Sequence, residues 1–125
     1  MVVFRLSEFV YNQRMIHIIR AHAAAGQIQE MMEMLQTYIK LAVDVERGIL
    51  AGGGAMHADC EAVLLDDGSQ QEFIWGADWN PATQEVTFES LINIRPRQNN
   101  RSLELQDLGL RAQVEQITRN LLGDK

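Results

Sequence analysis

The hydrophobic pattern changes its period between residues 28 and 45, and this change constrains the fold more than any other feature of the sequence. The first part has the i, i+3, i+4, i+7 spacing of an amphipathic helix, carried by Ile28, Met31, Met32 and Leu35. The second part alternates between apolar and polar residues, with Ile39, Leu41, Val43 and Val45 on one side. The sequence therefore predicts a helix that begins near Gly26, followed by a strand that begins near residue 39.

Turn residues divide the segment that follows into further strands. Gly48 can adopt a positive φ angle, so the sequence ERGI predicts a tight turn into a strand over 49–52. The sequence DDGS is suited to a hairpin turn, and Pro96 ends the last strand. The remaining strands are expected over 58–65, 71–79 and 85–94. Because short connections favour antiparallel pairing, the pattern predicts a meander of four or five strands.

The two ends of the chain differ in how clearly they predict structure. A helix is expected over 107–122, because Asp107 can cap its start and Gly123 can close its end. Its apolar stripe consists of Leu110, Val114, Ile117 and Leu121. At the other end, residues 15–20 suit a short strand. Residues 1–14 are expected to be an N-terminal extension, with Met15 as an alternative start.

Length and composition predict a single α+β domain over residues 1–125, with both helices on one face of the antiparallel sheet. The other face would then be partly open, and we expect a homodimer because small domains commonly cover or pair such surfaces. A net charge of -6 argues against binding to nucleic acid or to an anionic membrane surface. The single cysteine, Cys60, and the lack of an export signal or membrane span favour the cytoplasm.

Several sequence pieces occur in one order along the chain, namely DVERGI, HADCEAVLL, DGSQQEFIWG and INIRPRQNNRS. With the segments between them, over roughly residues 16–121, they resemble a small bacterial family known only as a domain of unknown function. The resemblance implies a fold and a set of positions but no reaction, since the family has no established activity. Asn99 stands where the family usually has a glycine, and Cys60 where a polar or acidic residue is frequent. Asn tolerates the left-handed backbone region, so the loop shape is expected to persist.

The sequence MHADCE places an imidazole and two carboxylates at alternate positions, His57, Asp59 and Glu61. On a strand these side chains would share one face, where they could ligate a divalent metal or supply a general base with an orienting acid. The alternative is an ordinary solvent-facing side of an antiparallel sheet, with Cys60 packed inward as a small hydrophobe.

A second group of candidate residues is cationic and lies before the terminal helix. It consists of Arg95, Arg97 and Arg101, interleaved with Asn93, Gln98, Asn99 and Asn100. Arginine presents a planar fork of donors that matches carboxylate or phosphate, so the group could bind a small anion. Alternatively, these arginines pair with Asp44, Glu46, Asp59 or Glu61 and fix the loop, and both interpretations predict that the two groups lie close together.

Two classes of function follow from these groups. The first is a non-enzymatic binding or interaction protein that recognises a small anion or a protein partner through Asn93, Arg95, Arg97, Asn100 and Arg101. The second is a small metal-assisted hydrolase that uses His57, Asp59 and Glu61 on a phosphate- or carboxylate-bearing substrate. Trp75 and Trp79 share one face of a strand, where they either stack on a ligand or pack against the terminal helix.

Overall fold

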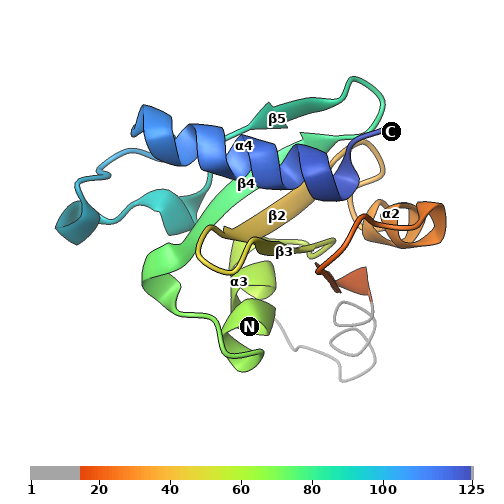
Figure 1. Cartoon of the computed structure of the whole chain (residues 1–125), viewed down its shortest axis with the longest axis horizontal. Helices are drawn as coiled ribbons and strands as arrows, with labels where there is room; N and C mark the ends of the chain where they lie inside the picture. Colours follow the sequence, from red (N-terminus) through yellow and green to blue (C-terminus); the bar gives the residue numbers. More distant parts are fainter. Residues whose placement is uncertain (1–14, 125) are drawn as a thin grey trace, which may run out of the picture.

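A five-stranded antiparallel sheet with the strand order β1-β3-β2-β4-β5 forms the centre of the protein in a computed structural model (Figure 1). The structure describes residues 15–124, so the predicted N-terminal extension and its alternative start lie largely outside the described residues. The strands are β1 (His17–Ile19), β2 (Ile39–Asp44), β3 (Ile49–Gly52), β4 (Ile74–Asn80) and β5 (Glu85–Thr87). The helices are α2 (Ala25–Met31), α3 (His57–Asp66) and α4 (Leu108–Leu122). The predicted α+β class with an antiparallel sheet is confirmed.

The strand order departs from an uninterrupted meander at one point. β2 and β3 form a hairpin, and the chain then crosses over through α3 to place β4 on the other side of β2 (Figure 1). β3 and β4 are both antiparallel to β2, so they run parallel to each other with β2 between them. The connection is long enough for such a crossover because it contains a helix rather than a hairpin.

The strand predicted over 58–65 is wrong, since this segment forms α3. Ala58, Ala62 and Leu64 are favourable helix residues, and the Asp59 carboxylate accepts the Met56 backbone N–H at 3.2 Å at the start of the helix. At the other end, the Ser69 and Gly68 N–H groups donate to the carbonyl oxygens of Leu64 and Leu65. Gly68 has a φ of 100°, as the residue after a helix often does in this arrangement. The sequence DDGS therefore ends a helix instead of forming a hairpin.

As predicted, α4 covers one face of the sheet, and α2, which lies beside the sheet, contributes Met31 to the core on that side; α3 covers the opposite face (Figure 1). The α4 face holds the larger core, in which Trp75 and Trp79 of β4 pack with Leu41 and Val114. The α3 face has a smaller core that includes Ala42, Ala51, Cys60, Leu64 and Ile74. The face that was predicted to be partly open is thus covered in part by α3.

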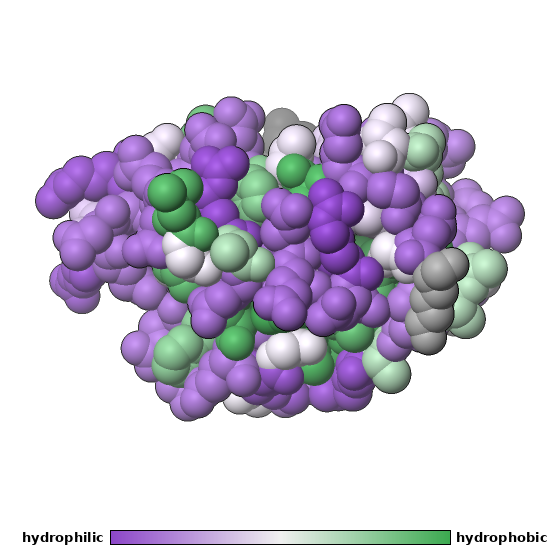
Figure 2. Space-filling model, turned by 45° about the horizontal axis from the view of Figure 1, so that its top comes forward, coloured by the Kyte–Doolittle hydropathy of each residue, from purple (hydrophilic) through white to green (hydrophobic). Residues whose placement is uncertain are grey.

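α4 agrees closely with its prediction. The Asp107 carboxylate accepts the Leu110 N–H at 2.9 Å, and Gly123 follows the last helical residue. None of the helices between residues 15 and 124 has the length and apolar composition that crossing a bilayer requires. Seen with the top of Figure 1 brought forward, the surface is mainly hydrophilic and its apolar residues lie in small separate groups (Figure 2).

Candidate functional site

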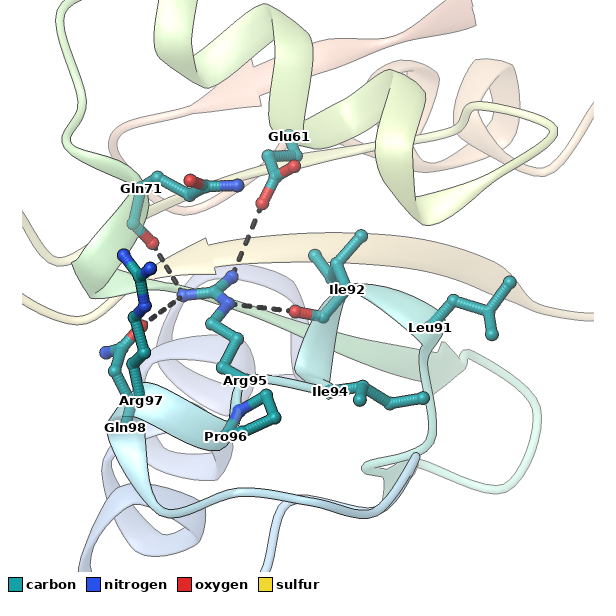
Figure 3. A pocket seen from close by; sticks show the side chains of 9 residues that line it. All are labelled: Glu61, Gln71, Leu91, Ile92, Ile94, Arg95, Pro96, Arg97 and Gln98. Atoms are coloured by element: carbon teal, nitrogen blue, oxygen red, sulfur yellow. Dashed lines mark hydrogen bonds and ion pairs between the residues drawn. The ribbon is translucent and has the colours of Figure 1, made fainter.

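An open cavity of about 510 Å³, here called cavity 1, lies between α3 and the loop that follows β5 (Figure 3). Its apolar wall comes from Leu91, Ile92, Ile94 and Pro96. Its polar residues are Glu61, Gln71, Arg95, Arg97 and Gln98. Arg97 and Leu91 lie at opposite ends of this set of side chains, with Arg95 between them (Figure 3). The cavity therefore combines a fixed polar floor with an apolar side and a cationic end.

Arg95 forms the floor of cavity 1, and its guanidinium is occupied by protein acceptors. Its Nε donates to the Ile92 carbonyl at 2.9 Å, and one terminal nitrogen donates to the Gln71 carbonyl at 2.6 Å. The other terminal nitrogen bonds to the Ile74 carbonyl and lies 3.3 Å from the Glu61 carboxylate. Because these contacts use the donors of the fork, Arg95 holds the loop against β4 and α3 rather than offering a free anion site.

The pairing of Arg95 with Glu61 confirms that the cationic and acidic groups lie close together. Their side chains are only 11% and 12% exposed, and the guanidinium carbon lies 4.5 Å from the centroid of the Trp75 ring. Burial lowers the pKa of Arg95 from its ordinary value, and the charge of Glu61 opposes that shift. The alternative in which an arginine pairs with a carboxylate and fixes the loop thus holds for Arg95.

Arg97 and Arg101 differ from Arg95, since both are exposed. Among residues 15–124, neither side chain makes an ion pair or hydrogen bond with another residue. Arg97 lines cavity 1, whereas Arg101 does not. The three predicted arginines therefore differ. Within the described part of the chain, Arg97 is the one that lines cavity 1 without an ion-pair partner.

Asn93 is a structural residue, so its prediction as a ligand-binding residue needs correction. It is fully buried, and its side chain accepts the Gly76 N–H at 2.8 Å and donates to the Gly76 carbonyl at 3.0 Å. The same amide nitrogen also donates to the Phe88 carbonyl at 3.1 Å. Asn93 thereby takes the place of a neighbouring strand, because it bonds to the backbone of β4 beyond the end of β5. A Cβ at Gly76 would lie 2.4 Å from the Cβ of Ser90, so only glycine admits the loop here.

Asn100 is also corrected from a ligand-binding to a structural role. It is 3% exposed, and its amide nitrogen donates to the carbonyls of Asn93, Ser102 and Glu104 at 2.7 to 3.1 Å. Its oxygen accepts the Gln106 N–H at 2.9 Å. Asn99 beside it has a φ of 61°, so the expected left-handed conformation at this position is confirmed.

Trp75 is likewise unavailable to a ligand, because it is 2% exposed and lies in the core under α4. Of the two interpretations of Trp75 and Trp79, packing against the terminal helix is the one observed. An indole buries a large apolar area, and both rings use it on the helix-covered face of β4.

His57, Asp59 and Glu61 do not share a face, because α3 replaces the strand that would have aligned them. His57 bonds to β4, Asp59 caps the start of α3, and Glu61 pairs with Arg95. Among residues 15–124, no group of three or more His, Cys, Asp or Glu side chains is placed to hold a metal ion. The metal-assisted hydrolase was predicted from a shared face for these three side chains, and the structure does not have that shared face.

Cys60 packs as a small hydrophobe, as expected. It is fully buried in the core of the α3 face, where its Sγ lies 3.5 Å from the Lys40 carbonyl oxygen. Burial raises the pKa of the Cys60 thiol to about 12, so the thiolate is not accessible near neutral pH.

A second cavity of about 260 Å³, here called cavity 2, adjoins cavity 1. Both cavities are lined by Leu91 and Ile92. Cavity 2 is completed by Lys40, Met56, His57, Ala58, Glu89, Ser90 and Leu103. The sequence pattern did not indicate Lys40 and Asp78 as neighbours of His57. Lys40 was visible as a polar residue on the alternating strand β2, but its pairing opposite Asp78 depends on the β2 and β4 register.

Comparison with protein-family models matches residues 17–121 to a family described as "Protein of unknown function (DUF5674)". The chain belongs to this family. The match confirms the resemblance to a domain of unknown function and covers every strand and helix described above except the last residue of α4. Searches of the curated proteins and of the solved structures gave no match.

Proposed function

We propose that this member of the DUF5674 family is a non-enzymatic binding protein. Its ligand is a small molecule that joins an apolar part to a carboxylate or phosphate group, and it binds in cavity 1. The observation that carries the proposal is the exposed guanidinium of Arg97 at one end of a cavity whose opposite side is apolar. Arginine favours such anions because its planar donors match their oxygens.

The size and rigidity of cavity 1 support this function. A volume of about 510 Å³ lies within the range of small-molecule sites. Its floor is held by the hydrogen bonds of Arg95, so little ordering of the protein is needed when a ligand enters. Leu91 is 68% exposed and Ile94 is 44% exposed, which leaves apolar surface for the ligand to cover.

Amide chemical-shift titration by NMR tests the proposal with hexanoate, hexyl phosphate, 1-hexanol and acetate. We expect one of the two amphiphilic anions to shift the amides of residues 91–98, because only these probes supply both an apolar chain and a charge. Hexanol and acetate should bind more weakly, since each lacks one of the two features.

Two variants locate the binding. Arg97→Gln should weaken binding of the anion about tenfold, the effect of losing one charge-assisted hydrogen bond. Arg101→Gln is the matched control, because Arg101 is an exposed arginine outside cavity 1, and it should leave binding unchanged. Equal weakening by both variants, or no shift at residues 91–98 with either anion, would contradict the proposal.

A homodimer and a cytoplasmic location remain our predictions for the intact protein. β1 and β5 each lack a neighbouring strand on one side within the described residues, and an unpaired strand edge is a surface at which a second copy can pair. The single buried cysteine suits a reducing compartment. Light scattering after size-exclusion chromatography would measure the mass in solution, and a monomer mass at all concentrations would contradict the homodimer.

A further inference from the structure

Cavities 1 and 2 are neighbours that share Leu91 and Ile92 in their walls. Four exposed large apolar residues line the pair of cavities, namely Met56, Leu91, Ile94 and Leu103. Only two other large apolar side chains within residues 15–124 are exposed to a similar degree, Leu65 and Leu108. The concentration of exposed apolar surface around the shared wall suits a ligand with an extended apolar middle.

Each cavity contains one cation without an ion-pair partner in the described part of the chain. Arg97 occupies the end of cavity 1 that lies away from Leu91 (Figure 3). Lys40 lines cavity 2, which shares Leu91 with cavity 1. Lys40 lies opposite Asp78 in the β2 and β4 register, but Asp78 bonds instead to His57 at 2.8 Å. The ammonium of Lys40 therefore remains available to a ligand.

His57 contributes a fixed ring to cavity 2. Its Nε2 is within hydrogen-bond distance of the Asp78 carboxylate at 2.8 Å and of the Ala77 carbonyl oxygen at 3.1 Å. A carbonyl oxygen only accepts, so we assign the proton to Nε2. The other ring nitrogen, Nδ1, has no partner among residues 15–124, and in this tautomer it can only accept a hydrogen bond, so Lys40 and not the ring is the charged donor that cavity 2 offers to an anion. Among residues 15–124, Glu89 is the one carboxylate that lines cavity 2, and its negative charge repels an anionic group held at Lys40.

We infer that the ligand carries two anionic groups joined by an apolar chain, with one group held at Arg97 and the other at Lys40 beside His57. The apolar chain covers Leu91 and Ile92 between them. This inference rests on the proposed function and adds the second anionic group and the extended shape. Joining two weakly held groups raises affinity most when the length of the chain matches the distance between their sites.

A length series tests the inference, with the α,ω-dicarboxylates from hexanedioate to dodecanedioate and the monocarboxylates of the same lengths. We expect the affinity of the dicarboxylates to pass through a maximum at one length. At that length the dicarboxylate should bind about tenfold more tightly than its monocarboxylate, the gain from one additional charge-assisted contact. The dissociation constants come from NMR titration of the full chain.

Three variants assign the two ends. Lys40→Gln should remove the advantage of the dicarboxylate and leave monocarboxylate binding unchanged, whereas Arg97→Gln should weaken both. Glu89→Gln should strengthen dicarboxylate binding, because it removes the opposing charge from cavity 2. Their thermal unfolding, compared with that of the unaltered chain, verifies that each variant is folded.

The outcomes separate this inference from the proposed function. Equal affinity of dicarboxylates and monocarboxylates at every length, with monocarboxylate binding still dependent on Arg97, would overturn the inference and keep the proposed function. An advantage of the dicarboxylate that survives Lys40→Gln would also overturn it. Absence of binding by all carboxylates and by hexyl phosphate would overturn both.

Discussion

The two faces of the sheet are built on different principles. Under α4 the side chains are large and apolar, and the two buried tryptophans of β4 pack there with leucines and valines from neighbouring elements. On the α3 face the core is smaller, and Asn93 and Arg95 attach the loop after β5 through hydrogen bonds to backbone groups of β4. Asn100 fixes the loop itself through bonds to its backbone. Both cavities lie beside this second face. Apolar packing thus stabilises one face, while polar side chains fix the shape of the other and leave room for a ligand.

Trp79→Ala should produce the largest loss of stability, because it empties the centre of the α4 face. Trp79 is fully buried, and truncation of a buried aromatic residue costs about 3–5 kcal/mol. Urea unfolding followed by circular dichroism measures the change in the free energy of unfolding. Trp79→Phe is the control: the indole Nε1 has no hydrogen-bond partner among the described residues, so this variant loses ring volume alone. A loss as large as that of Trp79→Ala would contradict this explanation.

Asn93→Ala should cost less but should damage the other face selectively. The variant leaves the Gly76 N–H and several carbonyl groups without their partner, and a buried unsatisfied group costs about 1–3 kcal/mol. Asn99→Gly in the same loop is the control and should not destabilise the protein, because Asn99 has a φ of 61° that glycine adopts freely. Chemical denaturation measures both variants, and a neutral Asn93→Ala would remove the distinction between the two faces.

Stability should decrease as the pH rises above 9, because of the Cys60 thiol in the α3-face core. The pKa of this thiol is raised from 9.0 to about 12 by burial, so the folded protein keeps its proton while the unfolded chain releases it. The contribution is complete below pH 9 and is lost toward pH 12, at no more than about 1.4 kcal/mol for each pH unit. Urea unfolding at pH 8, 9 and 10 should show a smaller decrease for Cys60→Ala, and identical slopes would contradict the assignment.

The smallest effect is expected at Asp67, which joins the end of α3 to the rest of the sheet. Its carboxylate lies 2.7 Å from both Arg20 and Arg47. The hydrogen bond from Arg20, followed by that from Arg47, lowers the pKa of Asp67 below its ordinary value. The resulting stability is present above the ordinary Asp pKa and is lost as the pH falls through the lower folded value. Asp67→Asn should therefore reduce the acid dependence of thermal unfolding.

Asp66→Asn provides the comparison for that experiment. Asp66 is exposed, and its side chain makes no ion pair within residues 15–124. Its replacement should leave the acid dependence of unfolding as it is in the unaltered protein. Equal responses of the two variants would show that the ion pairs of Asp67 do not shift its protonation.

The α4 face was predictable from the sequence because its side chains follow regular periods. The alternation from Ile39 to Val45 and the stripe of the terminal helix predict β2 and α4, and the structure confirms both. The α3 face was less predictable, since Cys60, Val63 and Leu64 suit a helix while His57, Asp59 and Glu61 imitate strand alternation. The glycine of DDGS was the available signal for the end of a helix.

The candidate site was predictable only in part. The sequence predicted that the arginine and carboxylate groups would meet, and Arg95 with Glu61 confirms it. It did not reveal that the side chains of Arg95 and Asn93 would form hydrogen bonds with backbone groups, because those partners lie on β4 and depend on tertiary packing. Lys40 was hidden for the same reason, since a lysine at a polar position of an alternating strand has no distinctive pattern.

The position of β2 between β3 and β4 has a consequence for local opening of the fold. β2 pairs with β4 along all of Ile39–Asp44 and with β3 from Leu41 to Asp44. Its backbone therefore cannot reach water unless a neighbouring strand separates first. Separation of β4 also requires the hydrogen bonds between Asn93, in the loop after β5, and the Gly76 backbone to break. Deuterium should replace the amide hydrogens of residues 41–44 only in molecules that unfold as a whole, which would make this strand the reporter of global stability.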